Sequence, residues 1–225
     1  MALLLLAAAG FARLGVWQLS RLRERRAHNQ ITLLARAVPP VTLVPDMKRM
    51  DTLAEHRVAA RGRYDHSHEI VVRGDVLQGV PGVRLVTPLL LAAGGPAVLV
   101  DRGFLPTPDA VTVDVHGADE PGELTVRGIA LPVPRGAGQP IEHEGRVTWR
   151  RLDLDALRDR LPYDLLPILI KQTPDTGLPR YPRRLEPPPL DEGPHLAYAL
   201  QWFLFAGLAA AFAVVVVGRS GRREP

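Results

Sequence analysis

An uninterrupted apolar run near the C-terminal end limits how this chain can fold. No Lys, Arg, Asp or Glu occurs between residues 196 and 217. About 20 apolar residues in a helix, each adding about 1.5 Å, match a hydrocarbon core about 30 Å thick. The run therefore predicts a transmembrane helix over 195–217, and the rest of the chain must fold beside a lipid bilayer.

A second apolar segment lies at the other end of the chain. Residues 2–12 form an unbroken apolar run, and after Arg13 the apolar character resumes over 14–19. A secretory signal peptide would carry positive charge ahead of its apolar run, and none precedes this one. We therefore predict a first transmembrane helix over 1–20. The missing polar flank is consistent with a natural start upstream of Met1.

Two anchors at opposite ends place both termini on one side of the membrane and residues 21–194 on the other. Arginines follow both spans, and positive charge favours the cytoplasm. Those after the first span would place the domain in the cytoplasm, whereas those after the second span would place the termini there. That rule is weak for loops longer than about 60 residues, so the C-terminal tail has more weight. We predict a two-span protein of the cell membrane with an extracytoplasmic domain and a basic cytoplasmic tail at 218–225. The arginines in question are Arg21, Arg23, Arg25 and Arg26 after the first span and Arg219, Arg222 and Arg223 after the second.

The positive charge of the chain is concentrated beside the membrane. The sequence has 28 Lys and Arg, 24 Asp and Glu and a formal net charge of +4, but seven of its arginines flank the predicted spans. The domain itself is therefore nearly neutral, which argues against nucleic acid as a partner. The chain has no Cys, so thiolate metal sites and a Cys nucleophile are excluded.

Between the spans, the sequence predicts a β-rich domain in which short segments of Val, Ile, Leu and Thr alternate with Gly and Pro. Residues 21–36 should continue the first helix until Pro39 and Pro40 stop it, and Asp153 should cap a short helix over 153–161. The fold class is therefore α+β: an antiparallel β-rich extracytoplasmic domain, as a sheet or a partly closed barrel, bracketed by two transmembrane helices. The expected strands are 57–64, 68–73, 83–91, 97–104, 123–130, 147–151 and 167–171, and 178–194 should be an extended, Pro-rich return to the membrane.

Two polar clusters in the domain are candidates for chemistry. Residues 65–69 could present two imidazoles to a metal from one strand face, but polar residues between two apolar strands favour a hairpin turn. Asp101 and Arg102 end an apolar strand with opposite charges, which indicates either a structural ion pair or the lining of a site. No P-loop, nucleophile elbow or dinucleotide fingerprint occurs, so soluble-enzyme interpretations lose support.

His195 stands at the start of the second span, where an imidazole is costly to leave unpaired and well suited to bind a metal or a haem iron. At helical spacing it shares a stripe with Tyr198 and Trp202. An interfacial belt of aromatic side chains beside a hydrated His explains the same pattern. Arg21 should lie at the same level, with Arg25 one turn farther out. Two guanidinium groups beside a His would suit a haem iron flanked by two propionates.

Four sequence blocks follow one another along the chain: LGVWQLSRL at 14–22, GVPGVRLVTPL at 79–89, VLVDRGFLP at 98–106 and HLAYALQWF at 195–203. Together with two spans that bracket a β-rich domain, they resemble the surfeit locus protein 1 family of cytochrome c oxidase assembly factors. The resemblance extends nearly from end to end. The chain departs from the family pattern at Arg13, where members usually continue apolar, and at Gly193 and Pro194, which replace a polar residue before the His.

The resemblance implies a role in building the haem a and binuclear centre of cytochrome c oxidase subunit I. Haem a would be bound through the His at the head of the second span, here His195. From the residues around it we predict in addition that Arg21 and Arg25 pair with the propionates and that Tyr198 and Trp202 wall the ring. The implied protein is a non-enzymatic haem chaperone or insertion factor in the lipid bilayer. Its implied partner is oxidase subunit I, with haem a synthase as a further candidate.

Two other functional classes stay open from the sequence. One is an assembly scaffold that contacts oxidase subunits and never holds haem, in which case His195 has no special role. The other is a membrane-tethered extracytoplasmic hydrolase that works through His143, Asp101 or the cluster at 65–69. The hydrolase requires these side chains to converge in one cleft.

Overall fold

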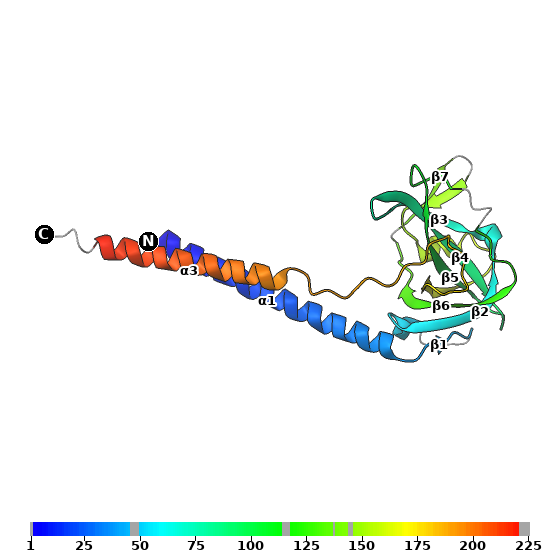
Figure 1. Cartoon of the computed structure of the whole chain (residues 1–225), viewed down its shortest axis with the longest axis horizontal. Helices are drawn as coiled ribbons and strands as arrows, with labels where there is room; N and C mark the ends of the chain where they lie inside the picture. The colour runs from blue at the N-terminus through cyan, green and yellow to red at the C-terminus, as the bar shows by residue number, and fades with distance from the viewer. Residues whose placement is uncertain (1, 46–49, 114–117, 137, 144–145, 221–225) are drawn as a thin grey trace. The chain divides into compact units, whose positions relative to one another are not determined.

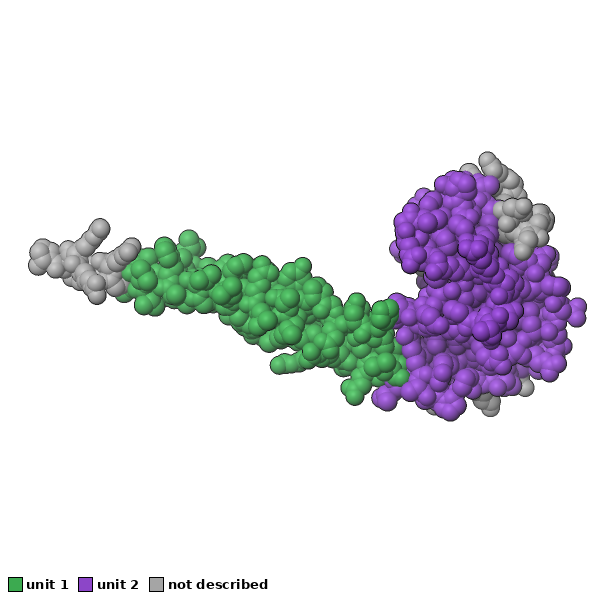
Figure 2. All heavy atoms as spheres, viewed as in Figure 1, with its two compact units in different colours: residues 1–33, 189–225 green, residues 34–188 purple. Residues whose placement is uncertain are grey.

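A computed structural model describes residues 2–45, 50–113, 118–136, 138–143 and 146–220 of the chain. The chain divides into two compact units, one made of residues 1–33 and 189–225 and the other of residues 34–188 (Figure 2). The first unit is helical and the second is β-rich.

The helical unit pairs two long helices. Helix α1 covers Ala2–Ala37 and helix α3 covers His195–Ser220, and the two lie side by side in opposite directions (Figure 1). Both are long and apolar enough to span a membrane. Helix α1 is continuous over 36 residues, which confirms the prediction that residues 21–36 continue the first helix beyond the span until the two prolines.

The helices pack through one face of α1. The ring of Phe11 lies 5.7 Å from that of Trp202, measured between centroids, and 5.8 Å from that of Phe205. Gly15 lies directly under the ring of Phe203, because a Cβ atom built on it would come within 2.7 Å of the ring. Together with Gln18, which contacts α3 as described below, these positions are spaced by four and three residues and form one helical stripe.

In the described part of the second unit, nine strands form one sheet in the order β1-β2-β6-β9-β5-β4-β3-β8-β7. Strand β2 pairs with β6 on one side and with β4 on the other, so β2, β6, β9, β5 and β4 close into a five-stranded barrel. The predicted α+β class is confirmed, and most pairings are antiparallel, although β1–β2, β3–β8 and β5–β9 run parallel. The elements are β1 Val41–Thr42, η1 Met50–Leu53, β2 Arg57–Tyr64, η2 His66–His68, β3 Ile70–Leu77, β4 Val80–Leu91, β5 Ala97–Pro106, β6 Glu123–Pro132, β7 Pro140–His143, β8 Arg146–Trp149, α2 Leu154–Arg158 and β9 Leu165–Gln172.

Among the described residues, buried apolar side chains form three clusters, and the two larger ones make most of the core. The first takes alternate residues from all five barrel strands and fills the barrel. The second lies outside the barrel, between β5, β9, β8 and the short helix α2. Strand β9 serves both, because Ile168 and Ile170 point into the barrel while Leu165 and Leu169 pack on the outside. Burial on both faces explains why its sequence is apolar without alternation.

Strand β4 begins earlier than expected. The predicted strand began at residue 83, yet Pro81 and Gly82 already lie inside β4. The turn from β3 to β4 needs only Gln78 and Gly79, whose φ angles of 53° and 81° suit a two-residue hairpin turn. Gly82 lies in the strand without a side chain because a Cβ atom would meet the ring of Phe104 at 2.4 Å.

Candidate functional site

His195 is the first residue of α3, and its ring contacts α1. Its Nδ1 atom lies 2.8 Å from Oε1 of Gln18. An amide oxygen can only accept a hydrogen bond, so Nδ1 is the donor in this contact, and in a neutral ring the lone pair is then on Nε2. Gly193 has a φ of 67°, and a Cβ atom built on it would lie 3.5 Å from Nε2 of His195. A glycine there leaves the lone pair of His195 uncovered.

Ion pairs tie the segment before α3 to α1. Arg26 donates from Nε and Nη2 to the two carboxylate oxygens of Glu192, each over 2.8 Å. Asn29 donates from Nδ2 to the backbone oxygen of Asp191 over 2.8 Å, and Arg25 lies 3.8 Å from the Asp191 carboxylate. The hydrogen bond from Arg26 lowers the pKa of Glu192, and Glu192 in turn raises the pKa of Arg26. These contacts hold the entry to α3 at a defined level along α1.

A shallow cavity of about 420 Å³ opens beside His195. The structure brings three predicted site residues together in its lining, namely His195, Arg21 and Arg25. Residues 24 and 28, which also line it, were not predicted. The spacing of residues 21, 24, 25 and 28 places all four on one face of a helix, and this could have indicated residues 24 and 28 as well. Arg21 is engaged by the Glu24 carboxylate over 2.7 Å at an exposed position.

The two aromatic residues predicted to wall a ring lie elsewhere. Trp202 stacks against Phe11 of α1 and belongs to the contact between the helices. Tyr198 is about half exposed and is not part of the cavity lining. The aromatic stripe of α3 is therefore used, at least at Trp202, for helix packing.

The cluster at 65–69 forms a 3₁₀ turn over His66–His68 and not a hairpin. The two flanking strands do not pair with each other. Both pair with the long strand β4, β2 at Tyr64 opposite Leu89 and β3 at Ile70 opposite Val86. The hairpin prediction is therefore wrong, because the turn connects two strands that pair with different parts of β4. Among the described residues, no three His, Asp or Glu side chains are placed to hold a metal ion.

The same turn lacks the geometry of a serine nucleophile. Asp65 Oδ2 lies 2.7 Å from Nδ1 of His68, and Ser67 Oγ lies 3.1 Å from that same nitrogen. A Ser-His-Asp relay needs serine and carboxylate on different ring nitrogens. Burial alone raises the pKa of Asp65, but hydrogen bonds from Ser67, Tyr163 and His68 outweigh it and hold this pKa below its usual value. The cluster is a turn stabilised around one carboxylate.

Asp101 and Arg102 both form structural ion pairs, but not with each other. The pairing of β4 with β5 shifts between Leu85 and Val86, and this bulge leaves Arg102 without a partner residue in β4. Asp101 Oδ2 accepts a hydrogen bond from Arg84 Nη1 over 2.8 Å. Arg102 is fully buried and pairs with Glu69 and Glu120.

The hydrolase candidates do not converge in the described part of the domain. The pocket beside the turn at 65–69, about 420 Å³ in volume, is lined by His66 and His68 but not by Asp101. The side chain of His143, the third candidate, lies outside the described residues.

Comparison with known proteins adds to this geometry. The sequence profile of the SURF1 family matches residues 5–207, which is most of the chain. The chain belongs to the SURF1 family. This match includes both long helices as far as residue 207 and the entire barrel, so the family assignment covers the unit with His195 as well as the β-rich unit.

Relatives within the SURF1 family resemble the chain over most of its length. A SURF1-like protein of Monosiga brevicollis is 26% identical over 94% of this chain and 85% of its own length. Surfeit locus protein 1 of Rattus norvegicus is 27% identical over 99% of this chain and 76% of its own. An uncharacterised SURF1-like protein of Mycobacterium bovis is 28% identical over 88% and 74%.

Proposed function

We propose that this protein is an assembly factor for cytochrome c oxidase that holds haem a at the mouth of α3 and assists its delivery to subunit I. Membership of the SURF1 family supports the assembly role, which is what the resemblance of the four sequence blocks implies. The observation that carries the haem-binding part is the contact of His195 Nδ1 with Gln18 Oε1, because in a neutral ring it leaves the Nε2 lone pair available.

The side chains around the cavity fit the proposed group. A neutral imidazole whose other nitrogen donates a hydrogen bond is the usual state of a histidine that ligates a metal. Arg21 and Arg25 supply guanidinium groups for the two propionates. Glu24 competes for Arg21 at an exposed position, and an exposed pair contributes little stability, so exchange of Glu24 for a propionate costs little. Haem a would supply redox and oxygen chemistry only after transfer, and the chain has to bind and release it.

The proposal treats the protein as non-enzymatic. The names of its relatives describe no catalytic activity, and the relay geometry at Asp65, Ser67 and His68 is unsuited to nucleophilic attack. Partners in this proposal are oxidase subunit I as the recipient and, as the source of haem a, the enzyme that makes it.

The test is haem retention by the full chain purified in detergent. The variant His195→Ala should lose most of the bound haem while the protein remains in the membrane. The matched control is His28→Ala, which removes the other imidazole of the same cavity and should retain haem with an unchanged spectrum. Arg21→Ala should weaken retention and leave the spectrum similar, because it removes a propionate contact and not the iron ligand.

The same variants should differ in the oxidase activity that they restore in cells. A strain without the protein should make subunit I but load it poorly with haem a, and expression of His195→Ala should restore oxidase activity less well than His28→Ala. If His195→Ala keeps full haem occupancy and spectrum, the ligand assignment is wrong and a scaffold without haem becomes the better account. Normal oxidase activity in the deletion strain would contradict the assembly role itself.

A further inference from the structure

Arg13 is a charged residue in the part of α1 that is apolar enough to span the membrane. Among the residues that the structure describes, it makes no hydrogen bond or ion pair, and its side chain is exposed at the surface of the helix pair. A cation in the hydrocarbon core is costly and is normally paired or hydrated there. The described residues of the helix pair supply no partner for it.

The depth of Arg13 can be read from the contact between Gln18 and His195. That contact marks the end of α3 nearest the domain, and Arg13 precedes Gln18 by five helical residues, or about 7.5 Å along the axis. Side chains on a helix lean toward its N-terminus, so Arg13 leans away from this nearer interface. In the other direction, helix α1 continues for about 17 Å to Ala2. Arg13 is therefore poorly placed to reach water at either surface.

A groove runs along α1 beside Arg13. Its volume is about 660 Å³ and its lining is mostly apolar. Gly10 contributes open space, since nothing lies within 4 Å of the position of its missing Cβ. The lining follows the spacing of one helix face, adjacent to the stripe that packs on α3. The residues of this α1 groove are Ala7, Gly10, Phe11, Arg13, Leu14 and Trp17.

We propose that the α1 groove docks a transmembrane helix of a partner protein that carries an Asp or Glu at the depth of Arg13. Small residues such as Ala7 and Gly10 allow the backbone of another helix to come close, and the guanidinium group of Arg13 then selects a carboxylate. A second copy of this chain lacks that chemistry, because neither 2–19 nor 196–217 contains Asp or Glu. A lipid phosphate lies at the interface from which Arg13 leans away. The proposal does not depend on haem binding.

The test measures association of the full chain with a synthetic polyleucine transmembrane peptide in phosphatidylcholine vesicles. The chain has no Cys, so Ser20→Cys provides a single site for a donor dye, and the peptide carries the acceptor. The peptide with one Glu at the depth of Arg13 should bind about 10-fold more tightly than the same peptide with Gln. Arg13→Leu should abolish this preference, Arg13→Lys should keep part of it, and Arg13→Glu should prefer a peptide with Lys.

Three outcomes would overturn the proposal. Equal binding of the Glu and Gln peptides to the natural chain would show that Arg13 selects no carboxylate. Energy transfer between two labelled copies without peptide, lost in Arg13→Leu, would assign the groove to a second copy. Loss of the Glu preference on addition of phosphatidylglycerol, with the chain still inserted, would assign Arg13 to an anionic lipid headgroup.

Discussion

Arg102 is the most deeply buried charge among the described residues of the β-rich unit. Its Nη1 donates to Glu69 Oε2 and its Nη2 to Glu120 Oε1, each over 2.8 Å, and its guanidinium carbon lies 5.0 Å above the ring of Tyr64. Glu120 also pairs with Arg184, so the network joins β5 to the Pro-rich segment that follows β9. Removing one partner of a buried pair leaves the other charge desolvated, which is the main cost of breaking it.

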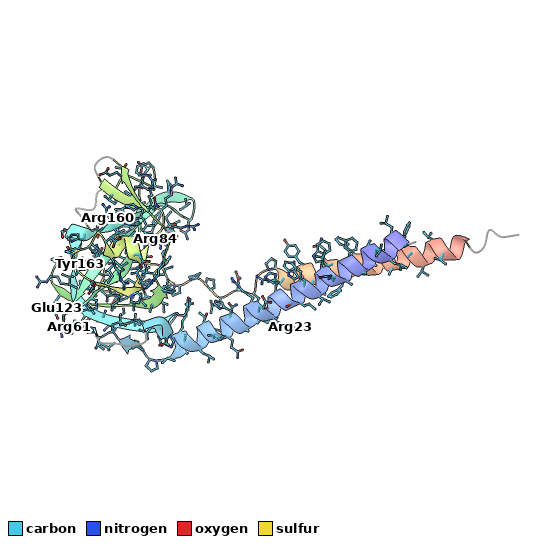
Figure 3. All side chains as sticks on the ribbon, turned by 180° about the vertical axis from the view of Figure 1, so that it is seen from behind. Arg23, Arg61, Arg84, Glu123, Arg160 and Tyr163 are labelled. Carbon is cyan, nitrogen blue, oxygen red and sulfur yellow. The ribbon has the colours of Figure 1, made fainter. Side chains whose placement is uncertain are left out.

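Substitution of Arg102 by Met should therefore destabilise the β-rich unit by about 3–5 kcal/mol. The matched control is Arg61→Met, because Arg61 pairs with Glu123 across β2 and β6 at the protein surface (Figure 3). An exposed pair of this kind contributes at most about 1 kcal/mol, so the control should unfold almost as the natural chain does. Denaturant unfolding of the full chain in detergent measures both, followed by the change in tryptophan fluorescence as Trp149 leaves the domain core. Equal midpoints for the two variants would contradict the argument from burial.

Among the helices and strands, the contact of Gly15 with Phe203 makes the sharpest prediction. Gly15→Leu would place a side chain where the ring now lies, and overpacking of this kind costs about 1–3 kcal/mol. The control is Gly207→Leu in α3, where nothing lies within 4 Å of the missing Cβ. Thermal unfolding in detergent should show a lower midpoint for the first variant only.

A change in haem binding should accompany that loss of stability. Separation of the helices at Gly15 removes the support that Gln18 gives to the ring of His195, so haem retention should fall in Gly15→Leu and not in Gly207→Leu. If Gly15→Leu keeps the stability and haem content of the natural chain, α1 and α3 do not pack through this face.

Local pattern was sufficient to predict several elements. The predicted strand at 57–64 matches β2, and the N-cap role of Asp153 is confirmed, since its side chain accepts from the backbone of Asp155 and Ala156. Both depend on neighbouring residues alone, through apolar alternation in one case and capping chemistry in the other. Residues that act through distant partners were harder to predict.

The closure of the barrel and the pairing of Arg84 with Asp101 could not be derived from the sequence. Strand β2 meets β4 and β6 through contacts between residues far apart in the chain, and no local period encodes which strands meet. The bulge at Arg102 changes which side chains share a face, so Asp101 and Arg102 gained separate partners. At the mouth of α3, the ends of the spans and helical spacing predicted that His195 lies near Arg21 and Arg25. The contact of Gln18 with His195 depends on how α1 packs on α3, which no local pattern encodes.

The arrangement of the two spans predicts the orientation of the whole protein in the membrane. Two spans at opposite ends require both termini on the same side, and the basic tail favours the cytoplasm. A reporter that is active only in the cytoplasm should be active when fused after Pro225 and silent when inserted at residues 187–189. The reverse pattern would invert the topology, and activity of both fusions would mean that one of the two helices does not cross.

The closed barrel also sets the order of events during synthesis of the chain. Strand β9 lies between β5 and β6 in the ring, although it is the last strand to be made. Until Gln172 has left the ribosome, β5 and β6 each have an open edge, and open edges are where unfinished sheets aggregate or are cleaved. The next regular element after β9 is α3. The nascent domain is thus vulnerable for most of its translation, and it becomes protected shortly before its second membrane anchor is made.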